Sequence, residues 1–102
     1  MRKIVVASMA IGVVTSSLFA HTALMSCMEN ADAMIICEAG YSDGSSASGV
    51  PLKVIQNGKV VLEKKFDANS EASFKKPQGD YTVILDGGDG HAVSVPSTSI
   101  FK

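Results

Sequence analysis

The fold is decided by the stretch VPLKVIQNGKVVL, residues 50–62. Asn57-Gly58 is the dipeptide that best fits a two-residue hairpin turn, because both positions accept a positive φ. On either side of it, apolar residues recur at alternate positions, which is typical of strands with one buried face. Pro51 has no N–H to donate, so it belongs at a strand start or on a sheet edge. The stretch therefore predicts a β-hairpin.

Short apolar segments bounded by turn residues continue on both sides of this hairpin. The strands we expect are residues 34–41, 50–56, 59–66, 71–75, 80–86 and 91–95. Several short strands at this spacing, with no helical pattern after residue 20, predict an all-β fold, a small antiparallel β-sandwich. Alternation places the following residues on the inner faces, and we expect them to be largely buried: Leu52, Val54, Val60, Leu62, Phe74, Tyr81, Val83 and Leu85.

The first 20 residues have the order of a secretory signal peptide. Arg2 and Lys3 precede an apolar run over residues 4–14, and the small residue Ala20 fits a cleavage site. The apolar run is roughly half the ~20 residues that a membrane-spanning helix needs. We therefore expect residues 1–20 to be a signal peptide and the protein to be periplasmic or secreted. Residues 21–33 would form an extended or irregular N-terminal arm, and residues 34–102 the β-sandwich domain.

Two other interpretations of the N-terminal region stay open. Leu24-Met25-Ser26-Cys27 loosely resembles a lipoprotein box, which would acylate Cys27 and anchor the protein to a membrane. Met25 is bulky for its place in such a box, and His21 interrupts the apolar sequence that should precede the cysteine. An uncleaved membrane anchor is the third interpretation.

Cleavage after Ala20 would leave 102 − 20 = 82 residues, enough for one small domain. Arg2 and Lys3 would be lost, so Lys+Arg falls from 9 to 7 while Asp+Glu stays at 10, a net charge of 7 − 10 = −3. Such a surface does not attract nucleic acid or anionic lipid. Residues 96–102 carry no hydrophobic span, so we expect no membrane insertion after cleavage.

The chain has two cysteines, Cys27 and Cys37. An even count in an exported protein predicts a disulfide. The bridge would close a loop of about ten residues and contribute roughly 2–3 kcal/mol by loop-closure entropy. Two free thiolates binding a soft metal are the main alternative, and an acylated Cys27 is the other.

The only two histidines, His21 and His91, suggest a metal site. An N-terminal His21 offers its amine and Nδ1 as a chelate, His91 adds a third nitrogen, and the Asp89 carboxylate can assist. Nitrogen-rich donor sets of this kind suit Cu(II) and Ni(II). Both donors of His21 must lose protons, from groups with pKa values of about 6.5 and 7.7–8.0, so binding should weaken in acid. Taken singly, each histidine is more often an exposed polar residue, and Asp89-Gly90 is more often a hairpin turn.

Three segments resemble the carboxypeptidase-regulatory-like, transthyretin-like β-sandwich family: residues 43–54, 57–60 and 77–83. They carry the family's G-x-P-hydrophobic-x-V pattern, its hairpin and its P-x-G-x-Y-x-V pattern, over roughly residues 41–95. Ser70 stands where the family usually has glycine, which bears on the tightness of that turn. The resemblance implies the sandwich fold and says little of function, because this fold is a generic module. The final residues 99–102 lack the Tyr-Arg-Gly-Ser tail of the hydroxyisourate hydrolase branch.

The whole layout is similar to small periplasmic proteins found with bacterial nickel and cobalt uptake systems. The shared features are the signal peptide, the mature His-x-Ala-Leu start, the two cysteines and the Gly-Asp-Gly-His sequence at residues 88–91. Residues 89–91 are also similar to the Asp-Gly-His element of periplasmic copper-resistance carriers, which bind Cu(II) through a mature N-terminal histidine, the Asp and the His. The resemblance implies nickel, cobalt or copper as the bound metal and a membrane metal transporter as a partner.

We expect a binding protein and not an enzyme. The chain has no Ser/His/Asp set, phosphate loop or paired-carboxylate motif that supports catalysis. A copper oxidase built on the same histidines would be the most plausible catalytic version. The main alternative to metal binding is a β-sandwich module for protein–protein contact in the cell envelope.

Overall fold

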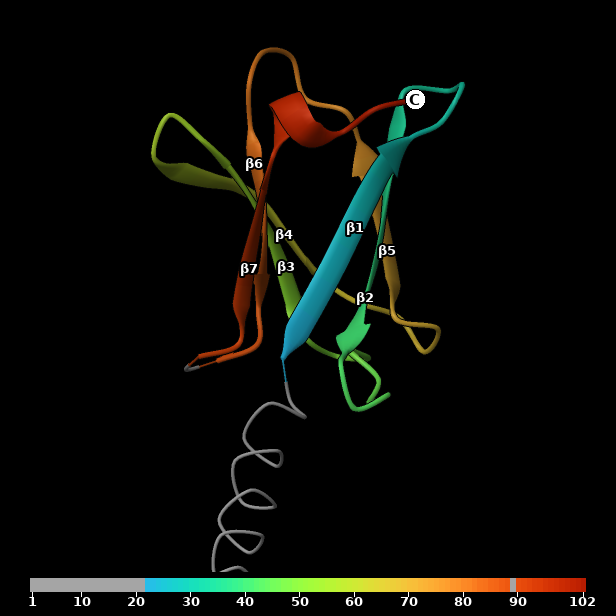
Figure 1. Cartoon of the computed structure of the whole chain (residues 1–102). Coiled ribbons are helices and arrows are strands. Elements are labelled where there is room, and N and C mark those ends of the chain that lie inside the picture. The colour runs from blue at the N-terminus through green and yellow to red at the C-terminus, as the bar shows by residue number, and fades with distance from the viewer. Residues whose placement is uncertain (1–21, 89) are drawn as a thin grey trace, which may run out of the picture.

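The computed structural model describes residues 22–88 and 90–102 as two packed antiparallel sheets (Figure 1). The strands are β1 (Ala23–Glu29), β2 (Met34–Tyr41), β3 (Pro51–Gln56), β4 (Lys59–Lys65), β5 (Glu71–Lys75), β6 (Thr82–Asp86) and β7 (Ala92–Pro96), followed by the 3₁₀ turn η1 (Ser97–Ser99). The strand order is β1-β2-β5 in one sheet and β4-β3-β6-β7 in the other. The predicted all-β antiparallel sandwich is confirmed.

The β3–β4 hairpin has the expected turn. Asn57 and Gly58 adopt φ values of 52° and 76°, the left-handed region that a tight hairpin of this type requires. Pro51 begins β3, where its missing N–H removes no ladder bond from the strand interior.

A β-bulge in this hairpin changes which residues face the core. Val54 pairs with Leu62, but Ile55 pairs with Val60, so Val61 is an extra residue on β4. Paired residues share a face of the sheet, and the bulge therefore turns Val60 to the outer face beside Ile55. The prediction that Val60 is buried is wrong, since 52% of its side chain is exposed. Strict alternation cannot anticipate a bulge.

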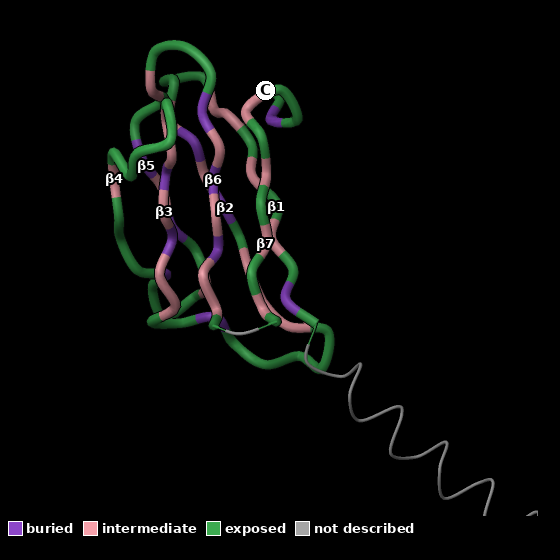
Figure 2. The backbone as a smooth tube through the Cα atoms, turned by 90° about the vertical axis from the view of Figure 1, so that its left-hand side faces the viewer, coloured by how far each residue is buried: buried purple, intermediate pink, exposed green. Residues whose placement is uncertain are grey.

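The core lies between the two sheets. Six of the predicted core residues are buried, namely Leu52, Val54, Phe74, Tyr81, Val83 and Leu85, and Leu62 is half-buried. Buried positions recur at every second residue along β2, β3 and β6 (Figure 2). Full burial of one such apolar side chain contributes about 1.5–3 kcal/mol, so these strands supply the main favourable free energy of folding.

The segment expected as an arm contains β1, which is an edge strand of the smaller sheet. It pairs with β2 along its whole length, from Ala23 opposite Tyr41 to Glu29 opposite Ile35. The sequence predicted an extended or irregular arm, and neither the strand nor its pairing with β2 was anticipated. Apolar residues occupy both faces of β1, with Met25 partly buried and Met28 53% exposed, so the hydrophobic pattern has no period of two.

The two long sides of the sandwich differ. On one side, which we call the closed side, β1 lies beside β7 (Figure 1), and the Glu29 N–H donates to the Phe101 carbonyl at 2.9 Å. On the other, the open side, the edge strands β4 and β5 are bridged by the Lys64 ammonium, whose Nζ donates to the Ser73 carbonyl at 2.5 Å. Within the described part of the chain, no helix has the length and apolarity needed to cross a membrane.

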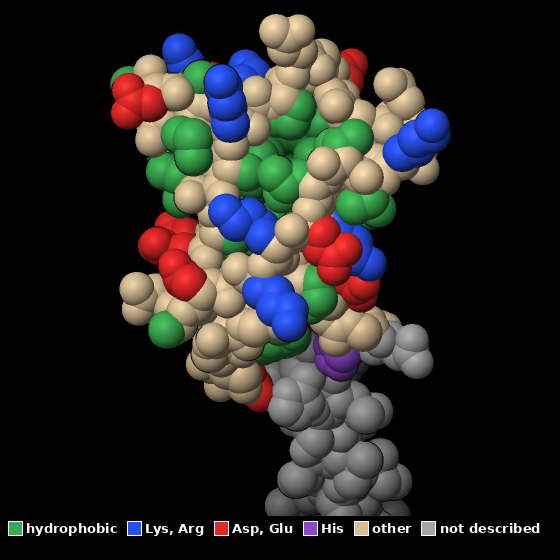
Figure 3. All heavy atoms as spheres, turned by 180° about the vertical axis from the view of Figure 1, so that it is seen from behind, with side chains coloured by type: hydrophobic (Ala, Val, Ile, Leu, Met, Phe, Trp, Pro, Cys, Tyr) green, Lys and Arg blue, Asp and Glu red, His purple; other side chains and the backbone are tan. Residues whose placement is uncertain are grey.

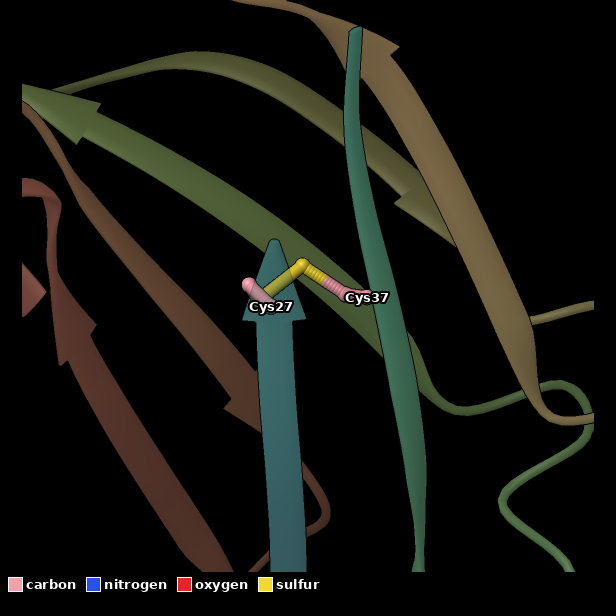
Figure 4. Close-up of a disulfide and its surroundings, with 2 residues drawn as sticks. All are labelled: Cys27 and Cys37. Carbon is pink, nitrogen blue, oxygen red and sulfur yellow. A yellow bond between two sulfur atoms is a disulfide. The ribbon is translucent and has the colours of Figure 1, made fainter. Parts of the chain in front are cut away.

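The predicted disulfide joins Cys27 to Cys37 across β1 and β2 (Figure 4). The two residues are direct cross-strand partners with their Cα atoms 4.1 Å apart. Cys37 is fully buried, so the bridge forms part of the core. Neither sulfur is a free thiolate that could bind a soft metal.

Candidate functional site

The structure places one of the three predicted metal ligands. His91 is half-buried and directly precedes β7, whereas His21 and Asp89 lie outside the described residues. Over residues 22–88 and 90–102, no group of three or more His, Cys, Asp or Glu side chains is placed to hold a metal ion. What the fold does fix is the position of the chain directly after His21.

Thr22 is tied to the loop that follows β2. Its carbonyl accepts a hydrogen bond from the Ser42 N–H at 2.8 Å, and its own N–H donates to the Ser42 Oγ at 3.1 Å. The next residue, Ala23, is buried and pairs with Tyr41. Hydrogen bonds at Thr22 and strand pairing at Ala23 therefore hold the chain that directly follows position 21 against the end of β2.

Tyr41 connects this anchor to His91. The two rings lie edge to face, with centroids 6.0 Å apart and an interplanar angle of 83°. Tyr41 pairs with Ala23 in one sheet, and His91 leads into β7 in the other. The start of β1 and the start of β7 thus lie at the same end of the sandwich (Figure 1).

Gly87 permits the close packing at this end. The His91 N–H donates to the Gly88 carbonyl at 3.0 Å, and the Gly87 N–H donates to the His91 carbonyl at 3.3 Å. A Cβ atom on Gly87 would lie 2.7 Å from that His91 carbonyl oxygen and 2.9 Å from the Tyr41 hydroxyl. Any side chain at position 87 would push Tyr41 and His91 apart.

The His91 ring has an incomplete set of partners. Its Nδ1 is buried and has no hydrogen-bonding partner among the described residues. Nearly all buried polar atoms in proteins have such a partner, so an orphaned ring nitrogen needs an explanation. A water molecule that reaches this end of the sandwich would supply one.

A charged pair stands beside the same loop. The Lys53 ammonium contacts the Asp86 carboxylate at 3.0 Å, and the Gly88 N–H reaches that carboxylate at 3.4 Å. The hydrogen bond from Lys53, with help from Gly88 and the lysine charge, holds the pKa of Asp86 below its ordinary value of 3.8. The same pairing raises the pKa of Lys53. Asp86, at the end of β6, is thus an ionised carboxylate that is already paired with Lys53.

Sequence reasoning did not identify Tyr41 or Gly87 as parts of this site. Tyr41 follows Ile35, Cys37 and Ala39 at alternate positions of β2. Alternation alone could therefore have predicted that the Tyr41 ring faces the core. Nothing in the sequence signals that β2 and β7, which belong to different sheets, meet at Tyr41 and His91.

Comparisons of the chain with protein families, with characterised proteins and with solved structures find no match. The interpretation of the site therefore rests on the chain's own residues.

Proposed function

We propose that the mature protein is a periplasmic or secreted binding protein for one divalent transition metal, nickel, cobalt or copper. Cleavage after Ala20 makes His21 the N-terminal residue in this proposal. One observation carries it: Thr22 is anchored at the end of the sandwich that also holds His91. In this proposal the metal joins His91 to His21, which directly precedes Thr22 in the sequence and lies 91 − 21 = 70 positions before His91.

The donor atoms follow from ordinary coordination chemistry. The α-amine and Nδ1 of His21 form one chelate. His91 contributes Nε2, because its Nδ1 is enclosed against the protein. The carboxylate of Asp89, in the loop before His91, assists as an oxygen donor. Three nitrogens and one oxygen suit the tetragonal geometry of Cu(II) and Ni(II).

The disulfide and the tyrosine support this arrangement without binding the metal. Cys27–Cys37 fixes β1 to β2 four residues after Ala23, which limits the freedom of the N-terminal strand. The Tyr41 ring packs edge-on against the His91 ring and restricts its rotation. A ligand pair held in place before binding loses less conformational entropy when the metal binds.

The sequence resemblance adds the biological setting. A transthyretin-like relationship, and the likeness to periplasmic proteins of nickel and cobalt uptake, suggest delivery of the metal to a membrane transporter. The metal is then cargo, and the protein is not an enzyme. Nucleic acid is not a partner in this proposal, because the mature chain carries a net charge of 7 − 10 = −3.

Titration calorimetry with Ni(II) and Cu(II) tests the proposal on three proteins. The first begins at His21, the second carries one additional glycine before His21, and the third has His91→Ala. The additional glycine keeps both imidazoles but separates the amine from Nδ1, so the chelate is lost. We expect the affinity of both altered proteins to fall at least tenfold, with unchanged circular dichroism. Equal affinity of the glycine-extended and native proteins would show that the chelate does not exist.

The alternative function, a module for protein–protein contact in the cell envelope, is favoured by a different feature. An apolar groove opens on the open side of the sandwich, away from the His91 end. Metal binding and protein contact would use separate surfaces, so one function does not exclude the other.

A further inference from the structure

The open side carries a groove of about 390 Å³ between β4 and β5. Its apolar lining comes from both sheets and includes Val54, Leu62, Phe74 and Pro77. Figure 3 shows apolar side chains in a hollow in the upper half of this face, with lysine side chains beside it. The groove therefore lies over the edge of the core between two edge strands, where Val54 and Phe74 are 0% and 3% exposed and Val61 is 52% exposed.

The backbone of β4 is available along this groove. The Phe66 N–H donates to the Val50 carbonyl at 3.0 Å, so the peptide groups of Phe66 point toward β3. Successive residues of a strand direct their peptide groups to opposite sides, and those of Lys65 and Glu63 therefore point to the free edge. Exposed edges of this kind are templates for pairing with another chain.

The edge of β5 is less accessible than that of β4. The Lys64 ammonium reaches across the open side to the Ser73 carbonyl, which lies on the outer edge of β5. A lysine directed across an edge in this way blocks the approach of another strand. Lys64 thus protects the edge of β5, and the pairing edge at the groove is that of β4 beside Leu62 and Glu63.

The charge around the groove is positive, although the protein as a whole is acidic. Five of the seven lysines after residue 21 lie on these two strands or directly after them, at positions 59, 64, 65, 75 and 76. Strand β4 itself has three lysines against one glutamate, a charge of 3 − 1 = +2. A second copy of this chain would bring the same positive edge, and like charges repel. An acidic partner is complementary.

We propose that this groove binds an extended, acidic peptide segment of a partner protein, which adds to β4 as a further antiparallel strand. Its backbone pairs with the free edge of β4 at Glu63, and its alternate apolar side chains enter the groove between Leu62 and Phe74. Its carboxylates face the lysines around the groove. This surface is distinct from the His91 end, and the proposal does not depend on metal binding.

The first arm of the test removes the pairing edge. The probe is a fluorescein-labelled peptide of sequence Asp-Val-Thr-Val-Thr-Val-Asp-Asp, and binding to the processed protein is followed by fluorescence anisotropy. Glu63→Pro removes an N–H that points away from β3, so the hairpin keeps its own hydrogen bonds. Glu63→Ala is the matched control, because it loses the same carboxylate and keeps the N–H. We expect Glu63→Pro to lower the affinity at least tenfold relative to Glu63→Ala.

The second arm tests the charge. Lys75 lines the groove, whereas Lys76 is already paired with Glu29 at 3.1 Å, so Lys75→Glu is the informative change. Lys102→Glu, at the last residue of the chain, is its control and alters the net charge equally. We expect Lys75→Glu alone to weaken binding several-fold. A peptide with lysine at each aspartate position should bind at least tenfold more weakly than the acidic one.

Thermal unfolding of each variant confirms that it is folded before binding is compared. The proposal is overturned if the unaltered protein does not bind the acidic peptide, if Glu63→Pro binds it as well as Glu63→Ala, or if the lysine peptide binds equally well. A dimer of the unaltered protein in sedimentation equilibrium that Glu63→Pro dissociates would also overturn it, in favour of a second copy as the occupant.

Discussion

At the scale of single residues, Gly87 determines how closely Tyr41 and His91 approach. The position has no room for a Cβ, since its nearest neighbour would be a backbone oxygen that cannot move independently. By contrast, the Gly40 position would place a Cβ 3.6 Å from the Ser45 carbonyl, an ordinary van der Waals contact. The two glycines lie in the same region of the molecule and make a matched pair.

We predict that Gly87→Ala destabilises the protein by about 1–3 kcal/mol, because overpacking forces the β6–β7 turn and the Tyr41 ring apart. Gly40→Ala should change the free energy of unfolding by less than about 0.5 kcal/mol. Urea unfolding followed by tyrosine fluorescence measures both. Equal effects of the two substitutions would show that the contact at Gly87 is not restrictive.

The Asp86–Lys53 pair makes stability depend on pH in a direction that follows from its pKa shifts. The pKa of Asp86 is lower in the folded protein than its ordinary value of 3.8, so the unfolded chain binds that proton more tightly. The stabilisation is present above this value and is lost as pH falls through the lower, folded pKa. The pKa of Lys53 is raised above its ordinary value of 10.5, so the stabilisation from Lys53 is lost as pH rises through its pKa in the folded protein.

With Asp86→Asn, the melting temperature should therefore fall less steeply below pH 4. At pH 7, the variant should melt at a slightly lower temperature than the unaltered protein. The effect is small because both side chains are substantially exposed and solvent screens the pair. Asp32→Asn, at an exposed position in the turn before β2, controls for loss of one negative charge. Melting curves of the two variants that coincide at every pH would contradict the assignment.

At the scale of the elements, the disulfide holds β1 on the smaller sheet. We predict that the double variant Cys27→Ser, Cys37→Ser keeps the β-sheet circular dichroism spectrum and loses roughly 2–3 kcal/mol of stability, because the unfolded chain regains loop entropy. Chemical denaturation measures the loss. In excess dithiothreitol, the unaltered protein should become nearly as unstable as the variant. If reduction leaves the unaltered protein as stable as before, the bridge contributes nothing.

The core strands carry most of the folding free energy. Leu52→Ala should cost about 2–5 kcal/mol, because Leu52 is fully buried between the sheets. Leu24 is 53% exposed on the outer face of β1, so Leu24→Ala should cost less than about 0.5 kcal/mol. Comparable losses for the two leucines in denaturant titrations would contradict the placement of the core.

Most strands could be predicted from sequence, because turn residues and period-two alternation are local signals. The strands β2 to β7 follow from them, with bounds within a few residues of the observed ones. Strand β1 could not be predicted as part of a sheet, because both of its faces are apolar and its pairing with β2 is tertiary. The outward turn of Val60 was missed for a related reason, since a bulge is set by the fit between two strands.

At the scale of the whole molecule, the sandwich brings the start of β1 and the start of β7 to one end. Sequence reasoning selected His91 from its residue type and glycine-rich surroundings, and the structure adds the packing of Tyr41 and Gly87 around it. That packing depends on the meeting of two sheets, which local patterns do not encode. The metal assignment itself remains a proposal that joins His21, Asp89 and His91.

Native and denaturing mass spectrometry of the protein recovered from the cell envelope tests the central claim most directly. Cells are grown with added Ni(II) or Cu(II), and the native and denatured masses are compared. The account predicts a mature chain that begins at His21, lacks two hydrogens because of the disulfide, and carries one divalent metal in the native spectrum that denaturation removes. A chain that begins at Cys27 with a diacylglyceryl group, or a chain that begins at His21 and holds no metal under either condition, would contradict it.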